Sequence, residues 1–246
     1  MGKHAKRDPD HLISIYKSFP EDVDTKAVHS KKRVQREWHR EKISAYKTYL
    51  PLDGKEVLDV GCGSGGVSFE IIRTAGFKRY VGVDFNDDAI KSANARNKRK
   101  DVKFIASHAE KLPFKDGEFD SLLLSDVLDH CYDYKSCLKE ARRVLRNGGQ
   151  ALVTVENKHS LWPIVEAVWD RFGDSRNYGD THLEHFSPGS LRKALEEQDF
   201  RVRKIFTVHN TKPFFHIVSG WYPKHLDRWT GRRCLGMTLC AVVEKK

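Results

Sequence analysis

The sequence lacks several features that would place it in particular classes of protein. No apolar run approaches the roughly 20 residues that a membrane-spanning helix needs. The first residues, MGKHAKRDPD, have no apolar core like that of a secretory signal peptide. The five cysteines form no CxxC pair and no spacing that suggests a zinc cluster. We therefore expect a soluble, cytoplasmic protein with reduced thiols and no metal site.

Positive charge is plentiful and unevenly placed. The net charge is +10, and the sums are +5 for residues 1–50, −3 for the middle of the chain and +8 for residues 200–246. Basic ends around a near-neutral centre suit an anionic substrate, a nucleic acid or an anionic lipid surface. Charges that only keep the protein soluble would give the same pattern, and composition does not separate these interpretations.

Short β-rich runs alternate with helical patterns along most of the chain. A helix over 31–50 is followed by strand and helix patterns in turn, which predicts a parallel sheet covered by helices on both faces. The last two strand patterns have no helix between them, so we expect an antiparallel pair at one edge of the sheet. The expected strands are 56–60, 80–84, 102–106, 119–125, 150–156, 200–209 and 234–245, and the expected helices after the first strand are 64–75, 87–97, 134–146 and 188–198.

The stretch VLDVGCGSGG (57–66) puts a buried strand directly against three alternate glycines. Gly61, Gly63 and Gly65 let a ligand approach the backbone, and Ser64 is placed to cap the next helix. Asp84 ends the following strand about 20 residues later, where such folds bind a ribose. Asp59 disfavours phosphate at this turn and suits an ammonium or sulfonium group. The pattern therefore predicts a ligand that contains a nucleoside.

Five blocks of sequence resemble the successive motifs of class I S-adenosylmethionine-dependent methyltransferases. They run in order over about 55–156, with weaker similarity at 182–202, and they include VLDVGCGSGG, VGVDFN, LPFKDGEFDSLLLSDVLDH and LKEARRVLRNGGQALVTVEN. The resemblance implies a Rossmann-like, doubly wound α/β fold with seven strands, mostly parallel with an antiparallel last strand. It also implies S-adenosylmethionine as cofactor and S-adenosylhomocysteine as product.

The same resemblance assigns cofactor contacts. Asp59 and the glycines would line the methionine half, Asp84 would hold both ribose hydroxyls, and Phe85 would pack against the adenine. Ala109 would offer its backbone amide to the adenine edge, and Ser125 would lie beside the sulfonium. His108 stands where the family usually has an Asp, and a neutral His can still accept that hydrogen bond. The full set of expected cofactor-binding residues is Asp59, Gly61, Cys62, Gly63, Gly65, Asp84, Phe85, His108, Ala109, Glu110 and Ser125, with Cys62 as a small filler.

Proton removal from the acceptor needs a base near the carboxyl ends of the strands. His130, with Asp129 before it, follows the strand at 119–125 and is the first candidate; a purely structural histidine is the alternative. His182 and His185 lie in an H-x-x-H-F-S element that small-molecule members of the family carry before the next helix. Ser187 ahead of Pro188 would cap that helix without any chemistry.

We interpret the chain as a single domain, 1–246, with two insertions around its cofactor-binding core. Residues 1–50 form an N-terminal helical extension, 55–156 the core, 157–187 a lid over the acceptor, and 188–246 a helix and strand pair carrying a basic, aromatic insertion at 210–236. The strand at 119–125 leads into SDVLDH (125–130), which resembles the corresponding segment of methyltransferases that act on small molecules and quinones. This resemblance favours methylation of an oxygen or nitrogen on a small or lipid-like molecule, with peripheral membrane contact. The alternatives are an RNA methyltransferase whose basic ends hold phosphates and a cofactor-binding scaffold without activity.

Overall fold

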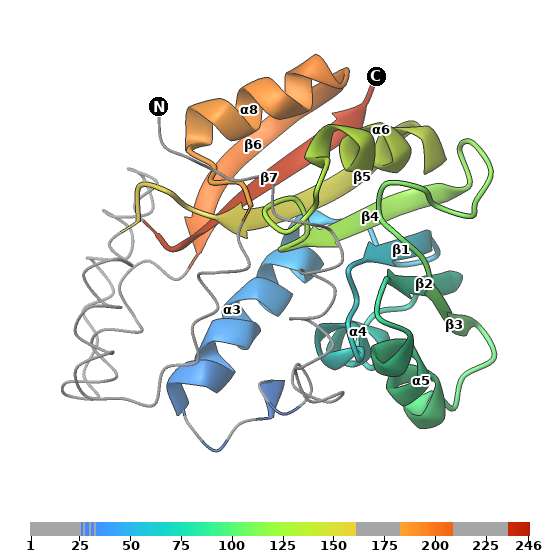
Figure 1. Ribbon diagram of the computed structural model, residues 1–246. Coiled ribbons are helices and arrows are strands. Elements are labelled where there is room, and N and C mark those ends of the chain that lie inside the picture. Colours follow the sequence, from blue (N-terminus) through green and yellow to red (C-terminus); the bar gives the residue numbers. More distant parts are fainter. Residues whose placement is uncertain (1–25, 27, 30, 32, 161–182, 209–235) are drawn as a thin grey trace.

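The computed structural model describes residues 26, 28, 29, 31, 33–160, 183–208 and 236–246, and among the side chains at 33–38 only that of Arg36. Helices and strands alternate along the described chain (Figure 1). They are α3 (Arg33–Tyr49), β1 (Glu56–Val60), α4 (Gly66–Ile72), β2 (Arg79–Asp84), α5 (Asp87–Arg96), β3 (Val102–Ala106), β4 (Phe119–Ser125), α6 (Tyr134–Val144), β5 (Leu145–Glu156), α8 (Pro188–Glu197), β6 (Phe200–Val208) and β7 (Thr238–Lys245).

The strands form one seven-stranded sheet in the order β3-β2-β1-β4-β5-β7-β6. The pairs β1/β2, β2/β3, β1/β4 and β4/β5 are parallel. Strand β7 runs antiparallel to both β5 and β6. The predicted Rossmann-like fold and the antiparallel pair at one edge are thereby confirmed. The order reverses between β1 and β4, which is where α/β sheets of this kind bind ligands.

Helices cover both faces of the sheet and bury a separate apolar cluster on each side. Helices α3, α4 and α5 lie on one side, and α6 and α8 lie on the other (Figure 1). Tyr46 and Ile71 belong to the first cluster, whereas Leu138 and Leu191 belong to the second. All four side chains are fully buried, and burying one such side chain is worth about 1.5–3 kcal/mol. The strands between these clusters are therefore apolar on both faces, as parallel strands must be.

Two local details differ from the expectations. Ser64 does not cap α4; Gly65 takes that position with a left-handed backbone (φ 83°) and no side-chain cap. Strand β5 begins at Leu145 rather than after the glycine pair at 148–149. Leu145 pairs with Phe119, and the register shifts before Ser121 pairs with Gln150, so the glycines lie inside an irregular strand instead of ending a helix.

Helix α3 belongs to the packed structure along its carboxyl-terminal half. Tyr46 is completely buried and its hydroxyl lies 3.2 Å from Thr154 Oγ1 of β5. Tyr49 packs against Phe206 of β6, with ring centroids 4.5 Å apart. The helix therefore spans the sheet from β5 to β6. In the described part of the chain, no helix has both the length and the apolar character needed to cross a membrane.

Candidate cofactor and acceptor site

The turn after β1 is held against the end of β2 by backbone hydrogen bonds. Gly61 N and Cys62 N both donate to Val83 O, at 2.8 and 3.0 Å. Gly61 and Gly65 have φ of 76° and 83°. A Cβ on Gly61 would lie 2.4 Å from Val127 Cγ2, so this position excludes every side chain. The sequence here folds into a tight, rigid turn that leaves backbone amides near the carboxyl edge of the sheet.

Asp84 links this turn to the start of α5. Its Oδ2 accepts from Gly63 N at 2.8 Å, and its Oδ1 accepts from Asn86 N at 2.9 Å. Asn86 in turn caps α5 by accepting from two backbone amides. Each carboxylate oxygen is thus fixed by one backbone donor and keeps further acceptor capacity. Two fixed acceptor oxygens at the end of β2 match the two adjacent hydroxyls of a ribose.

Asp59 is turned into the protein interior. It is 2% exposed, and its Oδ2 accepts hydrogen bonds from Ser68 at 2.5 Å and Tyr80 at 2.7 Å. Burial raises its pKa to about 6, although both hydrogen bonds oppose the shift. Asp59 therefore joins β1, α4 and β2 beneath the glycine turn. Its expected role toward the methionine half of the cofactor stays a prediction.

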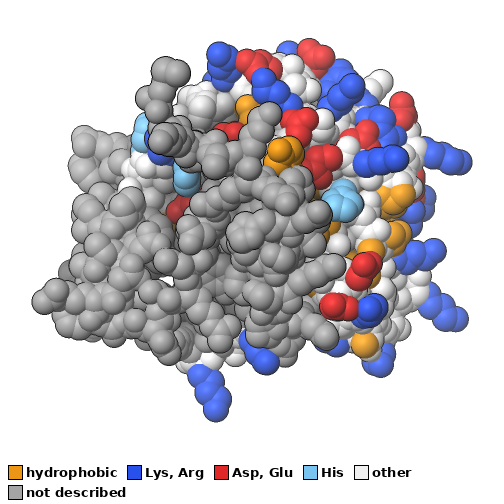
Figure 2. Space-filling view, viewed as in Figure 1, with side chains coloured by type: hydrophobic (Ala, Val, Ile, Leu, Met, Phe, Trp, Pro, Cys, Tyr) orange, Lys and Arg blue, Asp and Glu red, His pale blue; other side chains and the backbone are white. Residues whose placement is uncertain are grey.

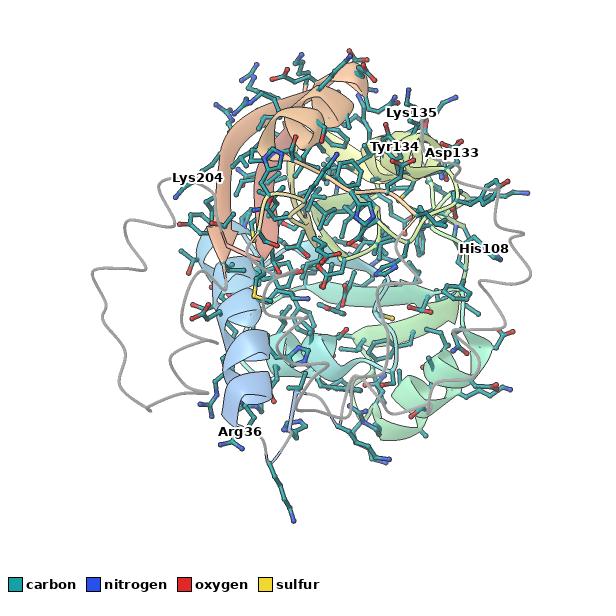
Figure 3. All side chains as sticks on the ribbon, turned by 60° about the vertical axis from the view of Figure 1, so that its left-hand side comes forward. Arg36, His108, Asp133, Tyr134, Lys135 and Lys204 are labelled. Carbon is teal, nitrogen blue, oxygen red and sulfur yellow. The ribbon has the colours of Figure 1, made fainter. Side chains whose placement is uncertain are left out.

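Two rings and a turn lie beyond Asp84, where an adenine would follow a ribose. The Phe85 and His108 rings are nearly parallel, with centroids 6.2 Å apart. His108 is exposed, and Figure 3 shows it on the opposite side of the molecule from Arg36 of α3. Its carbonyl accepts from Lys111 N at 3.1 Å, which places Ala109 and Glu110 in a tight turn. Cys62 is buried, as expected of a filler residue.

An ion pair that the sequence analysis missed lies at the end of β4. Lys42 Nζ of α3 contacts Asp126 Oδ2, directly after Ser125, the residue expected beside the sulfonium. Burial alone would raise the pKa of Asp126, but Lys42 outweighs it and the pKa is lowered. Thr154 Oγ1 also donates to Asp126 Oδ1 at 2.8 Å. The two charged residues are 84 positions apart, so no local pattern indicated the pair.

Asp129 holds neighbouring chain segments together. Its Oδ2 accepts from Glu156 N at 3.1 Å, and its carbonyl accepts from Leu183 N at 2.7 Å. Burial raises the pKa of Asp129, against the influence of His130. Asp129 thus connects the β4 loop to the end of β5 and to the segment before α8. A catalytic role for Asp129 and His130 stays a prediction.

The remaining predicted catalytic residues divide between described and undescribed parts. His185 is exposed in the short segment before α8. Ser187 caps α8 in a reciprocal capping box with Ser190, as expected. His182 and residues 161–182 of the proposed lid lie outside the described residues, as do residues 210–235 of the basic, aromatic insertion. In the described ranges, no cluster of three or more His, Cys, Asp or Glu could hold a metal ion.

The fold is that of a class I α/β core of the methyltransferase type. A protein family described as "Methyltransferase domain" matches residues 51–206. The chain belongs to this family of S-adenosylmethionine-dependent methyltransferases.

Curated relatives and a solved structure agree with this membership. The chain is 39% identical over 125 residues to phthiotriol/phenolphthiotriol dimycocerosates methyltransferase 1 of Mycobacterium ulcerans, covering 49% of this chain and 46% of that protein. It is 32% identical over 125 residues to demethylmenaquinone methyltransferase of Lactococcus lactis, covering 49% of each. The chain thus spans about half the length of these curated relatives. A possible histamine N-methyltransferase from Thermotoga maritima has the same fold, with a TM-score of 0.70 at 20% identity, covering 96% of this chain and 100% of that one.

Proposed function

We propose that this chain transfers a methyl group from S-adenosylmethionine to an oxygen or nitrogen of a small organic or lipid-like molecule. The observation that carries the proposal is Asp84, whose two oxygens are fixed by Gly63 N and Asn86 N beside the glycine turn. The names of two relatives, which contain a dimycocerosate and a menaquinone, support a lipid-like acceptor.

The residues on the cofactor side fit S-adenosylmethionine by their chemistry. When bound, the cofactor supplies a methyl group on a positively charged sulfur. Asp84 would accept hydrogen bonds from the ribose hydroxyls, and Phe85 would pack against the adenine. The turn from Gly61 to Gly65 lets the methionine half approach the backbone. The protein then needs to hold an acceptor lone pair in line with the sulfur and to exclude water.

A label-transfer experiment tests the acceptor class. The purified chain is given S-adenosylmethionine with a labelled methyl group and a cell extract split into aqueous, lipid and RNA fractions. Label is expected in the lipid or aqueous fraction. Label confined to RNA would contradict the proposal and establish the RNA alternative.

Binding is measured separately by calorimetry. Asp84→Ala should weaken S-adenosylmethionine by at least about tenfold, because each lost hydrogen bond in such a site is worth on the order of 1 kcal/mol. Asp88→Ala, in the first turn of α5, is the matched control with an exposed side chain. Unchanged affinity in the Asp84 variant would refute the assigned site.

The described surface gives little support to the RNA alternative. Figure 2 shows Lys and Arg side chains interspersed with Asp and Glu on the described part of this face. Several of the basic side chains are paired: Arg79 contacts Glu56 and Glu118, and Arg203 contacts Glu244. A phosphate-binding surface needs unpaired basic groups in a continuous stripe.

A further inference from the structure

The carboxyl-terminal half of α3 contacts the end of β4 and β5 through one set of side chains. Lys42 is 4% exposed and meets Asp126, the residue that follows Ser125. Asp126 has a left-handed backbone (φ 53°), and its N–H donates to Thr154 O at 3.0 Å. Thr154 also meets Tyr46 of α3. Helix α3, β5 and the β4 loop are therefore fixed relative to one another at the carboxyl edge of the sheet.

His39 lies one helical turn before Lys42, so the two side chains share a face of α3. Its Nδ1 is buried and has no hydrogen-bond partner. An unsatisfied buried polar atom costs about 1–3 kcal/mol, and native proteins keep few of them. This atom lies on the helix face that meets the β4 loop, so a hydrogen-bonding group of a ligand bound beside that loop would satisfy it.

The electrostatics around His39 keep its ring uncharged. Burial and then Lys42 lower its pKa to about 4, whereas Asp126 acts in the opposite direction. Among the described residues, Lys42 on its own helix and Asp126 in the β4 loop are the charged groups that act on it. At neutral pH the ring is therefore a neutral donor and acceptor.

We propose that His39 recognises an uncharged hydroxyl group on the methyl acceptor, beside the Lys42–Asp126 pair. This inference rests on the proposed function and narrows its substrate class. Lys42 and Asp126 already neutralise each other, so neither is available to compensate a buried carboxylate or ammonium on the acceptor. A hydroxyl both donates and accepts, so it satisfies Nδ1 in either tautomer.

Three twelve-carbon probes of matched length test this selectivity: 1-dodecanol, dodecanoic acid and dodecylamine. The full chain, labelled with ¹⁵N in its histidines and saturated with S-adenosylhomocysteine, is titrated with each probe, and the Nδ1 resonance of His39 is followed. Dodecanol should shift this resonance saturably, and the acid and the amine should not. Equal shifts with the acid or the amine, or no shift with dodecanol, would overturn the proposal.

Variants separate recognition from packing. His39→Leu should weaken dodecanol at least tenfold, whereas His39→Asn, which keeps polar atoms near the Nδ1 position, should retain affinity within about threefold. His29→Leu is the control, because His29 is 62% exposed. If His39→Leu does not fold, Lys42→Met provides the test: it should raise the pKa of His39 above about 4, and an unchanged titration would refute the assigned electrostatics.

The two proposals fail in distinguishable ways. If calorimetry shows no binding of S-adenosylhomocysteine, the proposed function is refuted, independently of the result of the dodecanol titration. Normal binding of S-adenosylhomocysteine together with no His39 response refutes only the hydroxyl site.

Discussion

Several single side chains in this protein connect two or three secondary-structure elements through hydrogen bonds. Asp59 is the clearest case, because one carboxylate oxygen buried under the glycine turn accepts from both α4 and β2. Its pKa of about 6 lies above the value near 3.9 that an unfolded chain gives an aspartate. The folded protein therefore binds the Asp59 proton more tightly than the unfolded chain does.

This difference predicts a pH-dependent contribution to stability. The contribution is fully present below about pH 4 and is lost as the pH rises through about 6, by an amount on the order of 2–3 kcal/mol. Asp59→Asn should lack it while keeping one acceptor oxygen. Urea unfolding of both proteins between pH 4 and 7.5 gives the difference curve. A difference that does not change with pH would show that Asp59 is ionised in the folded state throughout.

Gly82 of β2 predicts a steric effect that is separate from backbone conformation. A Cβ there would lie 2.6 Å from Phe104 Cδ1 and 2.9 Å from Cys62 Sγ. Gly82→Ala should therefore lower the free energy of unfolding by about 1–3 kcal/mol through overpacking. Gly189→Ala is the control, since the nearest atom to its new Cβ is Ser187 Oγ at 4.0 Å. Thermal unfolding compares the two, and equal effects would contradict the packing argument.

Helix α3 contributes both to the core, through Tyr46, and to the end of β4, through Lys42. Tyr46→Ala should remove a completely buried ring together with its contact to Thr154. The expected loss is about 3–5 kcal/mol. Tyr132→Ala, at a position that is 55% exposed, should change stability by less than about 0.5 kcal/mol. Chemical denaturation measures both, and a small loss at Tyr46 would show that α3 is dispensable to the fold.

The first four strands were predictable from the sequence alone. Apolar runs bounded by glycine and aspartate predicted β1, β2, β3 and β4 to within one residue, because buried parallel strands leave a strong local signal. The position of Asp84 at the end of β2 and of the glycine turn at the end of β1 was predictable for the same reason, whereas their contacts to a cofactor stay predictions. The start of β5 was not predictable, because glycine usually ends a helix and here occupies an irregular strand.

The contacts around the end of β4 could not be predicted from the sequence, for a physical reason. Lys42 and Asp126 meet only because β4 lies next to β5 and α3 crosses them. Contacts between distant positions depend on the completed topology, and periodicity reports only local structure. His39 has an ordinary place in an amphipathic pattern, and it becomes notable only once its surroundings are known.

At the scale of the whole molecule, the sheet is most strongly supported at its centre. Strands β2, β1, β4, β5 and β7 each have neighbours on both sides, whereas β3 and β6 are edge strands. Amide hydrogen exchange should therefore be slower in the five interior strands than in β3 and β6. Exchange followed by mass spectrometry would test this, and protection of β6 equal to that of β4 would contradict it.

Three segments that are far apart in the sequence meet in one small region of the described chain. Asn157 is 1% exposed; its Nδ2 donates to Gly236 O at 2.7 Å, and its N–H donates to Met237 O at 2.8 Å. Lys158 N donates to Phe186 O at 2.8 Å in the same place. Because these described residues close the chain on itself here, the length of chain between them adds little entropic cost. Insertions or deletions between the joined ends should therefore leave the stability of the sheet nearly unchanged.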